Sequence, residues 1–545
     1  MLTMCPRREP NMLRSGFKTP SDAREPSRWW DCGPLKMYCS SRRWRDSAFE
    51  SACALLAGVV RGFDTTSIRI LTCGFLLTLT GCMTVGPDYK RPIIDTPAFW
   101  RFEEKEVRDL ANSAWWEQFN DPVLNGLVQT ALEENKDLLI ATARIEEFFG
   151  RYFSTRGDQF PSAGGNADAF RQRQSEKGFV RIDGKDNPFN QYDAFLSGAW
   201  EIDFWGKFRR ATEAARAELL GTEESRRTVV LTLVSAVAAA YVDIRALDKQ
   251  LEITQRTADS RRDTLDLFQL RFRNGIISEV DLSQAESEYE DAMARIPDVE
   301  RAIGQTENAL SVLLGRNPGP IPRGLMLDEL VLPAVPAGVP SDLLERRPDI
   351  RQAEQTLIAA NAQIGVAKSL YFPTISLTGA FGTSSTELSN LFTAASRAWS
   401  FGVPLSVPLF TAGRIGGEVK ASEAVQQQAV YGYQQTIQNA FREVDDALLD
   451  RSKSGQRLDA LNRQLKALRN YARLARLRYD EGYASYLEVL DAERSLFNVE
   501  LLYTTSQNVL FRSLINIYKS MGGGWVTTAE DGMPAQPVME AGFIP

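Results

Sequence analysis

Histidine is absent from the 545-residue sequence, and four of the six cysteines lie within residues 1–60. The absence of histidine removes the commonest general base and the commonest metal ligand. The sequence also has neither a glycine-rich phosphate loop nor a nucleophile elbow. It therefore proposes no reaction, and we expect a protein that is not an enzyme and holds no cofactor or metal.

Long hydrophobic runs and an excess of positive charge are missing as well. The net charge of -7 gives no electrostatic reason to expect nucleic acid as a partner. After Cys82, no apolar run approaches the roughly 20 residues that a membrane helix needs. If the chain crosses a membrane, we expect it to do so with strands.

A short apolar run at residues 70–80 follows Arg61 and Arg69. It is too short to span a bilayer but suits the core of a secretory signal. It ends in LTGC at Cys82, which resembles the bacterial lipobox, where the signal is cleaved before an acylated cysteine. We predict a signal peptide over 61–81 and attachment of lipid, including palmitate, at Cys82. The alternative is a chance tetrapeptide beside a buried helix.

Residues 1–60 precede this signal and show no sustained periodicity among their Arg, Ser, Pro and Cys residues. A signal works at the start of a chain. We therefore interpret 1–60 as a non-structural extension and expect translation to begin near Val59 or Val60. A folded domain in this stretch would contradict the interpretation. Because Cys73 leaves with the signal, only Cys82 remains afterwards, so we expect no disulfide framework.

Two distant segments of the chain share a motif at a constant spacing. LRFRNGIISEVDLSQAE (270–286) and LRYDEGYASYLEVLDAE (477–493) lie 207 residues apart, and Gly206 and Gly413 keep the same offset. The Phe-Pro pairs at 160–161 and 372–373 are 212 residues apart. Chance does not produce the same spacing in separate motifs, so we predict an internal tandem duplication.

The two repeats, 121–315 and 341–522, follow one plan. A helical segment (121–156, and 342–370 in the second repeat) leads into Phe-Pro, and two strand-like runs follow. A very long helix comes next, from 207 to about 274 and from 414 to about 481, and a return helix closes each repeat near 314 and 521. Residues 82–120 are interpreted as a lipid-anchored segment, the proline-rich 316–340 as an equatorial linker and 523–545 as a disordered tail.

The first long helix carries an apolar seam that steps alternately three and four residues for about six heptads, which predicts coiled-coil packing. An ordinary intermolecular coiled coil is the alternative. The seam consists of Val230, Leu233, Val237, Ala240, Ile244, Leu247, Leu251, Thr254, Ala258, Arg261, Leu265, Phe268 and Phe272.

The strand-like runs at 194–205 and 400–410 alternate apolar residues with polar or small ones. Leu196, Gly198 and Trp200 fall on one face of the first run, with Ser197 and Ala199 on the other. Outer-membrane barrel strands show this alternation over about ten residues, although soluble sandwiches alternate too. Two strands per repeat give four per chain, and a closed barrel needs at least about eight. A trimer contributing twelve strands satisfies this requirement.

Several motifs together resemble the TolC-type outer-membrane efflux proteins. They are GPDYKRP (86–92), WEIDFWGKFRRATEAA (200–215), ERRPDIRQAE (345–354), YFPTISLTG (371–379) and LFTAGR (409–414). The branch that this chain is most similar to is the lipoprotein outer-membrane factors of resistance-nodulation-division (RND) pumps, of the OprM and NodT types. The resemblance covers about 83–522. It implies an α+β membrane protein in which a long antiparallel α-helical barrel joins a 12-stranded trimeric outer-membrane β-barrel.

The resemblance also implies a function and partners. The expected protein is a lipid-anchored homotrimer in the cell outer membrane that extends into the periplasm. It would act as the exit duct of a tripartite efflux system, passing drugs or other small molecules from a periplasmic adaptor (membrane fusion) protein and an inner-membrane RND pump. The alternatives are the duct of a type I protein secretion system and a periplasmic coiled-coil scaffold without a pore.

The same resemblance places a periplasmic gate in the second repeat, where three copies of Asp491 would ring the trimer axis. Asp480 departs from the pattern, because the OprM branch tends to carry a basic residue there. Carried over by position, the gate residues are Tyr479, Leu487, Glu488, Asp491 and Arg494, and the tip turns and adaptor-docking residues are Gly275, Ser278, Asp281, Gly482 and Ser485. Glycine at a turn permits a left-handed helix end, and Asp281 is expected to help lock neighbouring helices. Each gate residue could instead be a solvated or packed helix position.

Overall fold

The computed structural model describes residues 84–94, 96–97, 100–102, 114–175, 177, 187–335, 340–522 and 526. These residues belong to one compact unit, Gly81–Pro545. The interpretations of 1–60 and of the signal peptide, the lipid attachment at Cys82 and all of the tail except Val526 lie outside the described residues.

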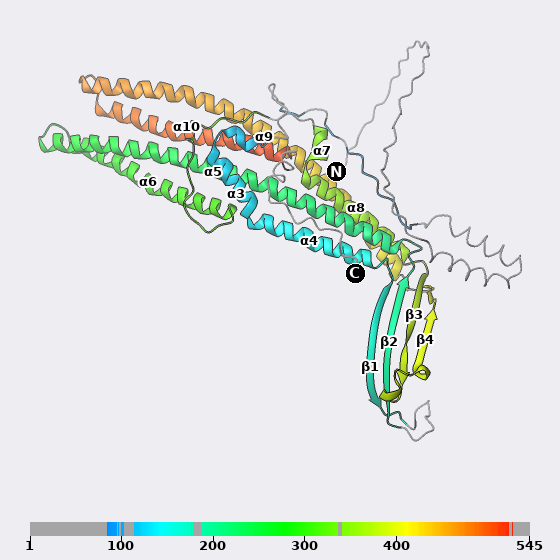
Figure 1. Cartoon of the computed structure of the whole chain (residues 1–545). Helices are drawn as coiled ribbons and strands as arrows, with labels where there is room; N and C mark the ends of the chain where they lie inside the picture. The colour runs from blue at the N-terminus through cyan, green and yellow to red at the C-terminus, as the bar shows by residue number, and fades with distance from the viewer. Residues whose placement is uncertain are drawn as a thin grey trace, which may run out of the picture. The chain divides into compact units, whose positions relative to one another are not determined.

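The long helices dominate this unit. α5 (Lys207–Arg273) and α9 (Arg414–Asp480) each have 67 residues, and the return helices α6 (Glu279–Leu313) and α10 (Tyr486–Ser520) each have 35. The predicted bounds of all four are confirmed. At 1.5 Å per residue, a 67-residue helix is about 100 Å long. α6 folds back on α5 and α10 on α9, and α10 also packs against α5, so the two hairpins lie side by side (Figure 1).

The predicted seam of α5 is largely buried. Ala240, Leu247 and Leu251 are half-buried and Phe272 is exposed, whereas the remaining positions are buried. The polar seam residue Arg261 is buried because its guanidinium pairs with Glu288 at 2.8 Å and lies 5.3 Å from the centre of the Phe497 ring. The seam therefore packs against the other helices of the same chain.

The helical segments that precede the strands are broken, contrary to the single helices predicted. In the first repeat, α3 (Pro122–Glu134) and α4 (Lys136–Gly157) meet at Asn135, whose extended backbone lets its side chain cap α4 by accepting from Leu138 N at 3.0 Å. In the second, α7 (Leu343–Arg346) ends before α8 (Pro348–Ser369). Proline disfavours helical backbone at the residue before it and suits a first helical turn, so Arg347 interrupts the helix.

The linker after α6 is bound to the first repeat by a buried polar network. Asp121, which is fully buried, caps α3 and accepts hydrogen bonds from Tyr241 Oη at 2.6 Å and Leu325 N at 3.0 Å. Tyr241 Oη in turn accepts from Gly324 N. Burial and the adjacent Asp121 carboxylate raise the pKa of Tyr241 above its ordinary value. The network fixes the linker at mid-length of α5.

Around this network lies a hydrophobic core built from α3, α5, α10 and the linker. Trp115, in the short 3₁₀ helix η2 (Trp115–Phe119), stacks on Tyr518 of α10 with ring centres 5.1 Å apart. Val526 is also buried in this core at 3 % exposure. The prediction of a disordered tail was therefore wrong for this residue.

The strands form one antiparallel sheet in the order β1-β2-β3-β4, with short β5 paired to β3. Their bounds are β1 (Ser162–Gln172), β2 (Phe189–Glu201), β3 (Thr374–Ser385), β4 (Arg397–Gly402) and β5 (Leu405–Ser406). The register places Gly165, Leu196, Phe381 and Trp399 in one row across the sheet. Because side chains alternate between faces, this row and the one containing Phe401 make an apolar face. The predicted strand over 194–205 is confirmed for 194–201, whereas β2 begins earlier, at Phe189, and residues 202–205 lie beyond its end.

The second strand run of the second repeat differs from the prediction of one strand over 400–410. β4 begins three residues earlier, at Arg397, and ends at Gly402, and only Leu405 and Ser406 pair again beyond it. Pro404 and Pro408 have no N–H to donate to a ladder, so they interrupt the pairing. Residues 407–410 of the predicted run lie beyond the sheet.

Within α5 there is a stretch that is apolar and long enough to cross a membrane, with a mean hydropathy of 1.7. The expectation that no such run follows Cys82 was therefore wrong by composition. Two-thirds of this stretch is buried against the rest of the chain, at 67 %. Core helices pass the same test, and the hydrophobic core accounts for the apolar character of this segment.

Candidate functional site at the helical tips

The two tips are the turns that join α5 to α6 and α9 to α10. Each long helix ends in a glycine with left-handed backbone, Gly275 at φ 68° and Gly482 at φ 79°. Both turns close in the same way, because the residue after each glycine donates to a carbonyl five residues back, at 2.9 Å from Ile276 to Arg271 and at 2.7 Å from Tyr483 to Arg478. The predicted left-handed conformation of both glycines is confirmed.

The α5–α6 tip is held by a capping box. Ser278 Oγ accepts from the backbone N–H of Asp281 at 3.3 Å, and the Asp281 carboxylate accepts from Ser278 N at 3.2 Å and Ser278 Oγ at 2.8 Å. Both donors at the start of α6 are thereby satisfied. Within the protomer, Asp281 thus stabilises the start of its own helix.

The α9–α10 tip has the matching serine and acid but uses them differently. Ser485 makes no side-chain capping bond. Glu488 instead accepts from Arg478 Nη1 at 2.6 Å, which ties the end of α9 to the start of α10. This ion pair was not predicted, because the sequence motif does not show which basic side chain lies next to Glu488.

Asp491 and Arg494 lie farther along α10 and are more exposed. Arg494 Nη2 is 3.6 Å from Asp491 Oδ1, and the two side chains are 57 % and 55 % exposed. Tyr471 of α9 donates to the other Asp491 oxygen at 3.5 Å. Arg494 therefore supplies the positive charge one turn from Asp491 that the sequence predicted.

The tips meet through a buried aromatic cluster. Tyr486, at 8 % exposure, packs against Phe268 of α5 with ring centres 4.4 Å apart and against Tyr479 at 5.7 Å. Burial, followed by the nearby Glu493 carboxylate, raises the pKa of Tyr486 to about 12. Tyr479 Oη also accepts from Arg271 Nη1 at 2.6 Å. Arg271 thus connects the two hairpins, and sequence reasoning missed it although it lies inside the duplicated motif.

Apolar side chains at the tips are exposed in the single chain. Ile276 and Val280 on the first tip are 69 % and 66 % exposed, and Tyr483 and Leu487 on the second are 79 % and 61 % exposed. The structure therefore places all the predicted tip residues at one end of the hairpins. Among the described residues, no group of three or more acidic or cysteine side chains is arranged to hold a metal ion.

A protein with an apolar-faced sheet at one end of helices about 100 Å long, and hairpin tips at the other, has the build of an outer-membrane efflux channel. The chain belongs to the outer membrane efflux protein family, whose profile matches residues 127–316 and 339–523. The chain is therefore an efflux component of the outer membrane.

Similar proteins include the solvent efflux pump outer membrane protein SrpC of Pseudomonas putida, 37 % identical over 463 residues that cover 83 % of this chain and 97 % of that protein. The cation efflux system protein CusC of Escherichia coli O157:H7 is 35 % identical, with 82 % and 97 % covered. Among solved structures, the outer-membrane channel OprN superposes with a TM-score of 0.73 at 30 % identity, covering 81 % of this chain and 99 % of that one. The open state of the Neisseria gonorrhoeae MtrE channel gives 0.74 at 32 %, covering 81 % and 98 %.

Proposed function

We propose that three copies of this chain form an exit duct that spans the outer membrane with a 12-stranded barrel and the periplasm with an α-helical barrel. The observation that carries the proposal is the open sheet. β1 and β4 each present an edge that pairs with no other described strand, and one face of the sheet is apolar. Exposed edges cannot persist in a bilayer, and four strands are too few to close. Twelve strands from three copies close the sheet and turn the apolar face to lipid.

The N-terminal segment supports a lipid anchor at Cys82. Val85 N donates to Trp205 O at 3.0 Å, at the junction between β2 and α5. Cys82 precedes Val85 by three residues in the sequence, which gives an acyl chain on Cys82 a short tether to this junction. An acyl chain on Cys82 would then reach the membrane at the level where the strands end. The anchor and the sheet are consistent with one membrane position.

Equal helix lengths support the tandem duplication. α5 and α9 have 67 residues each and α6 and α10 have 35 each, and both long helices start after a left-handed glycine, Gly206 and Gly413. The two repeats therefore deliver their tips to the same depth. Six hairpin tips in the trimer would form the periplasmic end of the duct.

The tips are proposed to carry the gate and the adaptor contact. Asp491 and Arg494 are exposed charged residues on α10. Three copies of Asp491 around an axis would repel one another unless nearby cations such as Arg494 neutralise their charge. The exposed apolar side chains of both turns, Ile276, Val280, Tyr483 and Leu487, offer a surface that a protein partner would cover. A periplasmic adaptor protein fits this position, with an inner-membrane RND pump reached through it.

The cargo is proposed to be small molecules, with selection made by the pump. The relatives include proteins named for solvent and for cation efflux. A duct shared by such different cargoes has little reason to select between them. A type I secretion duct is the second candidate within the same architecture, and a scaffold without a pore is the third.

The test is single-channel conductance of the lipidated protein in a planar bilayer. The double variant Glu488→Ala plus Asp491→Ala removes the gate charges, and Glu286→Ala plus Glu290→Ala removes two exposed acids from α6 as the matched control. We expect a small wild-type conductance that rises severalfold in the gate variant and is unchanged in the control. No current from any trimeric variant would contradict the duct and favour the scaffold. Equal open currents from all of them would remove the gate.

A further inference from the structure

The N-terminal segment marks one face of the helical layer α4-α5-α8-α9, in which neighbours pack in that order. On α8 it contacts Glu354, which accepts from Tyr89 Oη at 2.9 Å, and Asn361, which donates to Pro87 O at 2.9 Å. Gly86 lies against Gly365, where a Cβ on Gly86 would come within 2.5 Å of the Gly365 Cα. These three α8 positions form one stripe of the helix.

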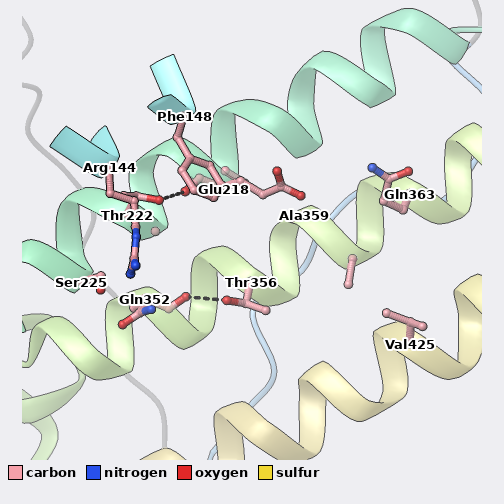
Figure 2. A pocket seen from close by; sticks show the side chains of 13 residues that line it. Arg144, Phe148, Glu218, Thr222, Ser225, Gln352, Thr356, Ala359, Gln363 and Val425 are labelled. Atoms are coloured by element: carbon pink, nitrogen blue, oxygen red, sulfur yellow. Dashed lines mark hydrogen bonds between the residues drawn. The ribbon is translucent and has the colours of Figure 1, made fainter. Parts of the chain in front are cut away.

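A recess of about 440 Å³ opens on the other face of the same layer (Figure 2). Its α8 lining includes Gln352, Thr356 and Gln363. Each of these is nine residues from a position on the N-terminal stripe, in the pairs 352 and 361, 354 and 363, and 356 and 365. Nine residues are about two and a half turns, so the two sets point in opposite directions.

The orientation of the recess follows from the proposed duct, on which this inference rests. The segment that leads from a lipid-anchored cysteine must run over the outside of the barrel, because the anchor is in the surrounding membrane. The opposite face of the layer then faces the channel. The floor of the recess is formed by α5 and α8, which are the middle helices of the layer, so a neighbouring copy that packs on α4 or α9 leaves it open.

The recess contains two side chains of opposite charge beside a floor of small apolar residues. Arg144 enters from α4 and Glu218 from α5, and among the described residues neither side chain has an ion pair or a side-chain hydrogen bond. In Figure 2 they point to different parts of the recess. Ala217, Gly221, Ala359 and Ala360 form a flat floor of small residues, and Phe148 lies one turn of α4 beyond Arg144. Exposed, unpartnered charges beside a flat apolar surface favour a ligand that is itself flat and charged.

We propose that this recess is a binding site in the channel wall for aromatic zwitterions. Arg144 binds the anionic group of the solute, Glu218 binds the cationic group, and the aromatic frame lies on the alanine floor beside Phe148. The site would hold such solutes transiently about 15–27 Å from the start of α5, since its α5 residues are 10 to 18 positions beyond Lys207.

Rhodamine B tests the site, because it carries a delocalised cation and a carboxylate on one rigid frame, and its ethyl ester keeps only the cation. Binding to the trimer in phosphatidylcholine nanodiscs is measured by fluorescence polarisation, with protein-free nanodiscs subtracted. Arg144→Gln should weaken rhodamine B about fivefold and leave the ester unchanged, because it removes one charge-assisted contact. Glu218→Gln should weaken both dyes about fivefold.

Arg156→Gln is the matched control, because it removes the same charge from α4 about three turns farther along, at an exposed position outside the recess. It should leave both dyes unchanged. Equal weakening by Arg144→Gln and Arg156→Gln would mean a general field in the channel and would overturn the site, as would the absence of saturable rhodamine B binding by the wild type. Conductance of the same preparations separates the two proposals: a conducting trimer without a dye site contradicts only the recess, and a trimer without current contradicts the duct.

Discussion

At the α5–α6 tip the arginine that precedes Phe272 reaches across to the other hairpin, whereas at the α9–α10 tip the arginine in the matching position stays within its own hairpin. Arg271 donates to Tyr479, and Arg478 donates to Glu488. The two arginines are 207 residues apart, as are the two turns. The matching position therefore serves a contact between hairpins at one tip and a contact within a hairpin at the other.

Two substitutions between the repeats account for this difference. The acid three residues after the capping serine is Asp281 in the first repeat, short enough to fold back into a capping box, and Glu488 in the second. The longer side chain extends to Arg478. The aromatic residue is Phe272 in the first repeat and Tyr479 in the second, and only the tyrosine offers an acceptor to Arg271. The two matching turns thus differ: one is closed by its own capping box, and the other is held by polar contacts to arginines.

The largest expected effect is on the aromatic contact between the tips. Tyr486→Ala removes a buried ring that contacts Phe268 and Tyr479, and we expect it to lower the free energy of local opening by about 3 kcal/mol. Hydrogen exchange of the amides in 475–492 measures this opening. Tyr483→Ala, three residues earlier and 79 % exposed, is the control and should change it by less than about 0.5 kcal/mol. Equal effects would mean that Tyr486 does not join the hairpins.

A smaller effect separates the two arginine contacts. A double-mutant cycle of Arg271→Met and Tyr479→Phe should give a coupling energy of about 1 kcal/mol that changes little with salt, because the acceptor is neutral and half-buried. The cycle of Arg478→Met and Glu488→Gln should give about 0.5 kcal/mol or less and vanish near 1 M salt, because those side chains are 55 % and 28 % exposed. Hydrogen exchange at the tip measures both. A stronger, salt-insensitive coupling in the second pair would reverse the comparison.

The smallest effect concerns the serines. Ser278→Ala breaks the capping box and should lower the stability of the first turn of α6 by about 1 kcal/mol. Ser485→Ala removes a side chain that makes no capping bond, and it should lower the stability of α10 by only a few tenths of that amount. Exchange rates of the amides at 279–282 and 486–489 report the two helix starts. Similar losses at both would show that Ser485 caps α10 in solution.

Periodicity predicted the long helices because they are long. An error of one residue in a 67-residue helix changes little, and the glycines at Gly275 and Gly482 mark where each must end. The faces of β2 were likewise predictable from alternation. The break at Asn135 was not, because a side-chain cap can replace a helical residue without disturbing the apolar pattern around it.

The partners of the tip residues were the least predictable feature. Sequence position placed Tyr479 and Glu488 correctly at the tip. It could not show that Tyr479 would accept a hydrogen bond from an arginine on α5, or Glu488 from an arginine on α9. For Tyr479 the choice depends on a contact between two helices that are 208 residues apart in the chain, and for Glu488 it depends on how the turn folds α10 back on α9. Exposed ion pairs contribute little energy, so they leave no strong pattern in the sequence.

α5 and α9 have equal lengths, so both helices span the same distance along the molecule. Each runs unbroken from the end of the sheet to a tip, so the distance from the sheet to the tips is set by a residue count. Seven residues added to both helices would lengthen the protein by about 10 Å and keep every seam position in register. The same seven residues added to one helix would carry Arg271 away from Tyr479. The reach of the helices can therefore change only if both long helices change together.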